Sequence, residues 1–412
     1  MAERRGAALQ RLRSAHEAAV LGELRRSGAL SRAELIERVG LSRTTLFTIV
    51  SDLLAREAVI EQPGSEPPGG RGRPATAVSL NPRGAELIGV GLLRTRMHIV
   101  VANHAHEIVA RRSAPLPAGT GPDERVAAVI GAVGELVGER GISLAPVKGI
   151  GLGLPGPVHD PADPEAGAMA PAAARIVTAL GRHFGAPVST DNNTRLAALA
   201  EVAWGAARGR SDIVYLRWSE GVGGGLVIDG RLVRGAHGAA GEIGHTSVDP
   251  QGPPCYCGGR GCLEGAIGLS ALLAECRARG AAVRDADHLV ALAASGDPEV
   301  VAVVREAAAT AGRVLAALAA QTDPECVVIA GELAALDGLV LGTVREQLAA
   351  LTLPATGRRT AVRASALGDD SAARGAVAML LRAAGEQVDE LLDRLAPPPG
   401  GLGSALTSGS TS

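Results

Sequence analysis

Four side chains between residues 245 and 262 have the types and spacing of metal ligands. His245 is followed by Cys255, Cys257 and Cys262 within the segment GEIGHTSVDPQGPPCYCGGRGCLEG, which runs from residue 241 to 265. One imidazole and three thiolates are the soft donor set that favours tetrahedral Zn²⁺, and four protein ligands leave no open position for a reactive water. We therefore predict a structural zinc site. The alternative is a group of free or disulfide-bonded cysteines, although the odd total of 5 cysteines would leave one unpaired.

Composition limits the classes of protein to consider. The chain has 412 residues, of which 46% are hydrophobic, enough for two or three domains with large cores. No apolar run is long enough to cross a membrane, and the first residues lack the apolar stretch of a secretory signal, so we expect a cytoplasmic protein. Residues 1–80 carry 12 Arg against 9 acidic residues, and the remainder carries 29 basic against 34 acidic residues. This mild asymmetry is compatible with an N-terminal module that binds nucleic acid, but motifs have to decide.

The first eighty residues show the pattern of a helix-turn-helix. A helical pattern ends near Ser27, and Ser31 with Glu34 forms a capping box that opens a second helix. That helix ends at Gly40, and Ser42 starts a third helix that continues to about residue 56. A short helix, a glycine turn and a longer helix predict a helix-turn-helix DNA-binding domain over residues 1–80. The alternative is a three-helix module that binds another protein.

The third helix has an apolar stripe and an exposed N-terminal half. We expect DNA contacts from the polar, basic and aromatic side chains of that half, which are Ser42, Arg43, Thr44, Thr45, Phe47 and Thr48. Phe47 either contacts a thymine methyl group or packs on a neighbouring domain. Two strand-like segments enclose a glycine-rich stretch with Arg71 and Arg73, so residues 61–80 are interpreted as a wing whose arginines contact DNA, or as an interdomain linker.

The remainder of the chain alternates β-prone and helical segments. Apolar strands are predicted at 87–101, 147–154, 213–216 and 226–228, and an amphipathic helix at 123–140. This order predicts an α/β body of two lobes from residue 83 to 390. Residues 391–412 form a low-complexity tail that we expect to be disordered.

Several ordered motifs of the body resemble the ROK family of repressors, open reading frames and sugar kinases. They are GIGLGLPGPV at 149–158, DNNTRLAALAE at 191–201, EGVGGGLVIDGRLVRGAHGAAGEIGH at 220–245, the cysteine cluster that ends in Glu264, and VVIAGELAALDG at 327–338. The resemblance implies two actin-like, ribonuclease H-like lobes with a ligand cleft between them. It also implies that the zinc site lies beside a sugar pocket. A winged helix-turn-helix in front of this body resembles the repressor branch.

The resemblance also implies which side chains bind the sugar. Glu242 and His245 of the GEIGH motif and Glu264 of the GCLEG motif are expected to reach the sugar hydroxyls, with Asn192 and Asn193 completing the pocket. Carboxylates and amides suit this role because a mismatched sugar would leave buried polar groups unpaired. The alternative for the two glutamates is a role in supporting the zinc loop.

Two departures from the kinase members predict that the body has no catalytic residues. Kinases carry Asn-Asp where this chain has Asn192 and Asn193, and an amide cannot accept the proton of the attacking hydroxyl. The first phosphate loop reads GLLRT at 91–95, without the Asp-x-Gly-x-Thr pattern of the kinases, so the acidic residue and the close-packing glycine are both missing. We expect sugar binding without phosphoryl transfer.

The sequence therefore predicts a transcriptional regulator, a repressor of carbohydrate-related genes. Its partners would be double-stranded operator DNA, a sugar or sugar phosphate effector, and further copies of the chain in a homodimer or homotetramer. The alternatives are an ATP-dependent, glucokinase-type sugar kinase with a fused DNA-binding module, and a regulator whose pocket answers to a protein partner.

Overall fold

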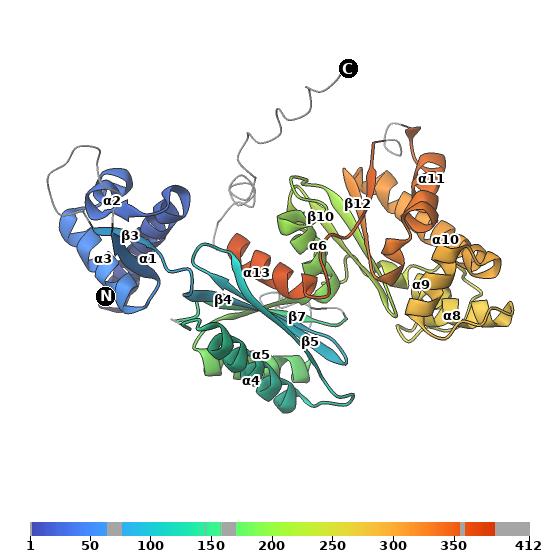
Figure 1. Cartoon of the computed structure of the whole chain (residues 1–412), viewed down its shortest axis with the longest axis horizontal. Helices are drawn as coiled ribbons and strands as arrows, with labels where there is room; N and C mark the ends of the chain where they lie inside the picture. Colours follow the sequence, from blue (N-terminus) through green and yellow to red (C-terminus); the bar gives the residue numbers. More distant parts are fainter. Residues whose placement is uncertain are drawn as a thin grey trace, which may run out of the picture.

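The computed structural model describes residues 2–63, 76–144, 146–156, 158, 170–354 and 359–383. Figure 1 shows an N-terminal helical unit at the left, a first α/β lobe in the middle and a second lobe at the right. The wing tip with Arg71 and Arg73 and the tail at 391–412 lie outside the described residues. Within them, the α/β class predicted for the body is confirmed.

The N-terminal unit contains three helices and a small sheet. Helices α1 (Ala2–Ser27), α2 (Arg32–Val39) and α3 (Arg43–Ala55) pack around a core that includes Leu35 and Leu46. Strands β1 (Leu30–Ser31), β2 (Val59–Pro63) and β3 (Thr76–Leu80) form an antiparallel sheet in the order β1-β3-β2. The predicted capping box is confirmed, because Glu34 N donates to Ser31 Oγ and Ser31 N donates to the Glu34 carboxylate. Gly40 ends α2 with a φ of 72°, a left-handed conformation that glycine adopts without strain.

The first lobe is a five-stranded sheet covered on both faces. Its strands are β4 (Ala85–Leu92), β5 (Arg96–Asn103), β6 (Ile108–Pro115), β7 (Gly149–Leu154) and β8 (Val188–Asn192), in the order β6-β5-β4-β7-β8. Helices α4 (Pro122–Arg140) and α5 (Pro171–Phe184) cover one face, and α13 (Ser371–Ala383) covers the other (Figure 1). The chain therefore returns to the first lobe after building the second.

The second lobe has a sheet in the order β11-β10-β9-β12-β13. Its strands are β9 (Ile213–Trp218), β10 (Val222–Ile228), β11 (Arg231–Leu232), β12 (Cys326–Ala330) and β13 (Ala361–Ala364). Helix α6 (Asn193–Trp204) packs on this sheet and against α13. Among the described residues, the other elements of this lobe are η1 (Ile243–His245), α7 (Leu263–Ile267), α8 (Leu269–Ala278), α9 (Ala286–Ser295), α10 (Pro298–Thr322), η2 (Glu332–Ala335), η3 (Asp337–Leu341) and α11 (Gly342–Leu351).

Glycines on one face of the first sheet allow α13 to lie close to it. A Cβ atom on Gly89 would come within 2.1 Å of the Ala373 carbonyl oxygen, and one on Gly151 within 2.4 Å of the Ala376 carbonyl oxygen. Side chains point to the same face at every second strand position, so the alternating glycines of GIGLGL leave room for the helix backbone. This packing accounts for Gly151 without a phosphate ligand.

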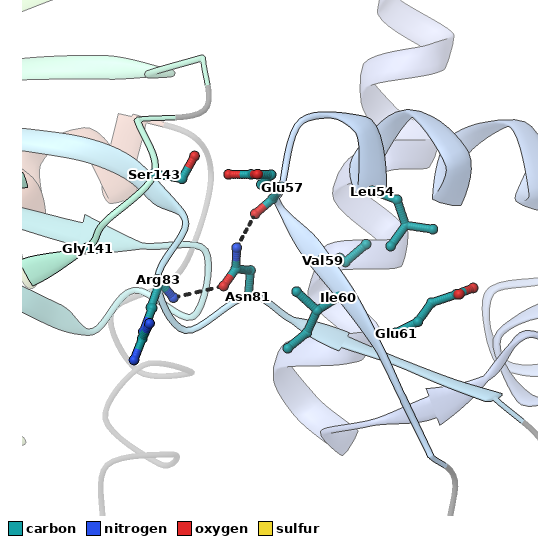
Figure 2. A pocket seen from close by; sticks show the side chains of 9 residues that line it. All are labelled: Leu54, Glu57, Val59, Ile60, Glu61, Asn81, Arg83, Gly141 and Ser143. Atoms are coloured by element: carbon teal, nitrogen blue, oxygen red, sulfur yellow. Dashed lines mark hydrogen bonds between the residues drawn. The ribbon is translucent and has the colours of Figure 1, made fainter.

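The N-terminal unit meets the first lobe at a polar junction (Figure 2). Asn81 Nδ2 donates to the Glu57 carbonyl oxygen at 2.7 Å, and Arg83 N donates to Asn81 Oδ1 at 3.0 Å. Arg25 Nε adds a 2.8 Å hydrogen bond to the His104 carbonyl oxygen. A pocket of about 450 Å³ at this junction is lined from both sides, for example by Leu54 and Ser143. Backbone acceptors therefore set the orientation of the two units.

A buried carboxylate, that of Glu86, lies near the same junction and interacts with Lys148 and His104. Lys148, the single lysine of the chain, has its Nζ 2.6 Å from Glu86 Oε1, and His104 Nδ1 is 3.3 Å from Glu86 Oε2. Burial alone would raise the pKa of Glu86, but His104 and Lys148 outweigh it and hold that pKa well below its usual range. Glu86 is therefore charged at neutral pH.

No described helix has the length and hydropathy needed to cross a membrane.

Candidate functional site

The four predicted metal ligands converge. The side-chain ligand atoms of His245, Cys255, Cys257 and Cys262 all lie within 4.8 Å of one another. His245 Nδ1 is 3.7 Å from Cys255 Sγ, and the sulfurs of Cys257 and Cys262 are 3.6 Å apart. Two sulfurs bound to one Zn²⁺ at ~2.3 Å are separated by about 3.8 Å, so this donor set fits a tetrahedral ion. All the cysteines are free thiols, so the disulfide alternative is wrong for the described residues.

Tight turns bring the three cysteines together. Cys255 N donates to the Gly259 carbonyl oxygen, and Gly259 N donates to Cys257 Sγ at 3.4 Å. Gly261 has a φ of 58°, and a Cβ atom there would lie 1.7 Å from the Asp249 carbonyl oxygen. Only glycine fits this position, because any side chain would push Cys262 away from the other ligands.

The same crowding disfavours a thiolate at Cys262 unless a cation is present. Burial first, and then the neighbouring thiols, raise the pKa of Cys262 to about 12. A divalent cation reverses this balance, because a coordinated thiol loses its proton at neutral pH. The donor set therefore suits a metal ion better than three free cysteines.

Two of the predicted sugar-binding side chains, Asn192 and Glu242, lie near the cluster ligand His245. Glu242 directly precedes η1, and His245 ends it, so this short helix places both side chains together. Asn192 Nδ2 is 3.2 Å from Glu242 Oε1 and 2.8 Å from the Gly156 carbonyl oxygen. Burial raises the pKa of Glu242, and the nearby Arg195 and His245 oppose that rise. The group offers one partly buried carboxylate and one amide to a polar ligand.

Glu264 and Tyr256 complete this group on the side of the zinc loop. Glu264 Oε2 accepts a 2.8 Å hydrogen bond from Val222 N, so one of its oxygens is already engaged by the first residue of β10. The hydroxyl of Tyr256 lies 3.3 Å from His245 Nε2, and the two rings meet edge to face. Loss of water around this hydroxyl, together with the Glu264 carboxylate, raises the pKa of Tyr256 to about 12. The Tyr256 hydroxyl thus contacts His245 and lies near Glu264.

Asn193 lies deeper, where β4 ends. Its Nδ2 donates to the Leu92 carbonyl oxygen at 2.7 Å, and its Oδ1 is buried without a hydrogen-bond partner among the described residues. A Cβ atom on Gly153 would lie 2.3 Å from this oxygen, which shows how closely β7 covers it. The amide is therefore held against the first loop by a contact that a carboxylate could not make, since a carboxylate has no proton to donate.

Asp191 is held by two arginines. Its side chain is buried, and its two oxygens accept from Arg195 Nε at 2.6 Å and Arg234 Nε at 2.7 Å. Arg195 also donates to the carbonyl oxygens of Val158 at 3.0 Å and Gly238. Arg195 thus ties the end of β8 to two loops, at Val158 and Gly238. A carboxylate fixed in two ion pairs is poorly suited to act as a general base.

The first phosphate loop, GLLRT at 91–95, and the glycine-rich segment GVGGG at 221–225 differ from each other. In the first, Leu93 N donates to the Arg96 carbonyl oxygen, and Arg125 Nη1 donates to the Leu93 carbonyl oxygen at 2.9 Å, so the turn is closed by its own contacts. In the second, a Cβ atom on Gly224 would lie 2.3 Å from Ile243 Cδ1, and one on Gly225 2.7 Å from Ala198 Cβ. Packing of η1 and α6 on β10 accounts for these glycines.

The predicted DNA-contacting residues occupy the start of α3. Ser42, Arg43, Thr44, Phe47 and Thr48 are exposed and Thr45 is half-buried. The Phe47 ring is 40% exposed and lies between two guanidinium groups, those of Arg32 at 5.3 Å and Arg43 at 5.5 Å from its centroid. Ser42 caps the helix by accepting from Thr45 N at 3.2 Å. The surface presents the Arg43 guanidinium beside an aromatic ring, whereas Arg32 is also paired with Glu61 at 2.6 Å.

Sequence reasoning missed Tyr256, Arg195 and Arg32. Tyr256 stands between two cysteine ligands, and Arg195 follows Asp191 at a helical spacing of four residues, so both carried a signal. Arg32 carried none, because its approach to Phe47 depends on the crossing of α2 and α3.

Comparisons with known proteins agree on one family. The profile described as "ROK family" matches residues 87–383. The xylose repressor of Caldicellulosiruptor bescii is 29% identical over 255 residues, which cover 59% of this chain and 61% of that protein. The chain thus spans somewhat less than two thirds of the length of this curated relative.

Two solved structures are similar to the chain. One is a ROK family transcriptional regulator described as a homologue of the Escherichia coli MLC protein, with 25% identity, a TM-score of 0.68, and coverage of 92% of this chain and 96% of that one. The other is a ROK hexokinase from Thermus thermophilus, with 32% identity, a TM-score of 0.59, and coverage of 71% and 96%. The first likeness takes in the N-terminal unit as well as the body.

Proposed function

Because the chain belongs to the ROK family, we propose that it is a sequence-specific DNA-binding transcriptional regulator, a repressor of carbohydrate-related genes. The observation that carries this proposal is the exposed polar face with Arg43 at the start of α3, joined through a hydrogen-bonded junction to a body in which Asn192, Glu242 and His245 lie together. Guanidinium and hydroxyl groups at the start of a recognition helix suit phosphates and base edges in the major groove. We place the protein in the cytoplasm as a homodimer or homotetramer.

The effector pocket comprises Asn192, Glu242, His245 and Glu264, with Asn193 at its base. Their carboxylates, amides and imidazole are suited to the vicinal hydroxyls of a sugar or sugar phosphate. We propose that this pocket is catalytically silent, because Asn193 cannot take a proton and Asp191 is engaged by Arg195 and Arg234.

We assign Zn²⁺ to His245, Cys255, Cys257 and Cys262. When bound, the ion would supply charge that keeps three thiols ionised and holds the loop closed. Its ligand His245 turns the opposite ring nitrogen toward the pocket, so the metal orients a pocket residue and takes no part in a reaction. Effector binding would change DNA affinity by reorienting the lobes, with a coupling of ~1–3 kcal/mol.

A DNA selection experiment tests this proposal. Purified zinc-loaded protein is incubated with genomic fragments, with and without a panel of sugars and sugar phosphates, and the retained DNA is sequenced. We expect specific fragments whose recovery one sugar changes. Arg43→Ala should weaken binding to those fragments ~5- to 150-fold, the worth of one base-reading contact. Arg305→Ala, an exposed arginine on α10, should leave binding unchanged. Absence of any enriched fragment with the unaltered protein would refute the regulator.

The likeness to a hexokinase supports a second candidate, an ATP-dependent sugar kinase with a fused DNA-binding module. An ADP-release assay across the same sugars separates the two candidates. Turnover that depends on ATP and on one sugar would favour the kinase.

A further inference from the structure

We infer that Tyr256 takes the place of an effector hydroxyl in the ligand-free protein, and so decides which sugars enter the pocket. This inference rests on the effector pocket proposed above. Tyr256 is neither a metal ligand nor one of the sugar contacts expected from the family resemblance. The Tyr256 hydroxyl lies 3.3 Å from His245 Nε2, on the side of the ring opposite the metal cluster.

The chemistry of the two groups near the hydroxyl, His245 and Glu264, supports this role. His245 Nδ1 faces the sulfur of Cys255, so the neutral imidazole that binds a metal through Nδ1 carries its proton on Nε2 and donates. Glu264 can only accept while it is ionised. A group that bonds to both residues must therefore accept a hydrogen bond from the imidazole and donate one to the carboxylate. A phenol hydroxyl meets both demands, and so does a sugar hydroxyl.

Tyr256 is also placed so that it can leave. Tyr256 is 72% exposed, although its hydroxyl lies against His245, so the ring can turn into solvent without disturbing a packed core. Cys255 and Cys257 on either side fix its backbone to the metal cluster. The motion is therefore confined to the side chain. A sugar must supply a hydroxyl with the same two hydrogen bonds to displace Tyr256, and a sugar without that hydroxyl would leave His245 and Glu264 unpaired.

Tyrosine-specific NMR and binding measurements test this inference on the full-length, zinc-loaded protein. The chain has 2 tyrosines, so ring-labelled tyrosine gives two sets of signals. Tyr215 is only 1% exposed within β9 and serves as the internal control. The probes are glucose, xylose, N-acetylglucosamine, glucose 6-phosphate and N-acetylglucosamine 6-phosphate. A probe that binds should shift the Tyr256 signals and leave those of Tyr215 in place.

Tyr256→Phe removes the competing hydroxyl and keeps the ring. We expect it to tighten the binding of that probe by ~2- to 12-fold, the range for loss of one neutral hydrogen bond, with an unchanged zinc content. Unchanged or weaker binding by Tyr256→Phe would overturn the inference and leave the proposed effector pocket standing.

The inference remains decidable if no probe binds the unaltered protein. Binding of a probe by Tyr256→Phe or Tyr256→Ala alone would then support it, because removal of the hydroxyl would have opened the pocket. If no probe binds either variant, both the inference and the sugar effector are refuted, whereas the DNA selection still tests the regulator on its own.

Discussion

Replacing Asn193 by aspartate should damage the fold without restoring a kinase. The Asn193 amide donates to the Leu92 carbonyl oxygen at 2.7 Å in a buried position, and Asn193→Asp would set a carboxylate oxygen against that carbonyl oxygen. The lost hydrogen bond contributes about 1 kcal/mol, and an unpaired buried charge costs about 1–3 kcal/mol more. We expect a loss of about 2–4 kcal/mol in the free energy of unfolding at pH 7.

The loss of stability in Asn193→Asp should depend on pH and should disappear at low pH. Burial and the facing carbonyl oxygen would raise the pKa of the new carboxyl in the folded state above its unfolded value of about 4. The folded state would then bind the proton more tightly, so the destabilisation is fully present above the folded pKa and disappears as the pH falls below about 4. A protonated carboxyl can donate to Leu92 as the amide does.

Urea unfolding of Asn193→Asp at a series of pH values, with Asn193→Leu as the control, tests this reasoning. The leucine variant also loses the hydrogen bond but carries no charge, so its loss of stability should not depend on pH. ADP release should stay at background for both variants. Equal stability of Asn193→Asp and the unaltered protein at pH 7 would refute the electrostatic argument, and sugar-dependent turnover would identify a degenerate kinase.

Three further outcomes follow from packing, metal ligation and charge. Gly375→Ala should lower the free energy of unfolding by about 3 kcal/mol or more, because its Cβ would lie 1.7 Å from the Leu196 carbonyl oxygen. The control, Gly131→Ala, lies in the open middle of α4 and should raise the free energy of unfolding by about 0.5–1 kcal/mol. Urea unfolding measures both changes. Cys257→Ser should lose the bound metal measured by elemental analysis while Cys276→Ala, in the core, keeps it, and acidification should release metal from the unaltered protein as the thiols regain protons. Hydrogen bonds from Arg26 and Ser27 lower the pKa of Glu23 to about 2. The unaltered protein should therefore be more stable than Glu23→Gln above about pH 4.5, and this difference in the free energy of unfolding should vanish as the pH falls through 2. A difference that persisted at pH 2 would contradict this assignment.

Local patterns in the sequence were sufficient for the elements and for the metal cluster. The capping box at Ser31 and the glycine at 40 define α2 through contacts within a few residues, and they could be predicted for that reason. The three cysteines lie within eight residues of one another, so their convergence needed only tight turns.

Long-range contacts were beyond the same reasoning. The contact of Asn193 with Leu92 joins residues that are 101 positions apart, and no local pattern states which way the amide turns. The engagement of Glu264 by Val222 N depends on where α7 lies relative to β10. Sequence motifs identified which side chains gather at the site, and tertiary packing determined which of their atoms already take part in hydrogen bonds.

The return of α13 to the first lobe has a consequence for how the protein is made. The sheet of that lobe is encoded by residues 85–192, but the helix that covers its glycine-lined face is encoded by residues 371–383. During synthesis this face therefore stays open until nearly the whole second lobe has left the ribosome. The nascent first lobe has to wait with an unfinished core, and we expect the docking of α13 to be the closing step of folding for the described part of the body.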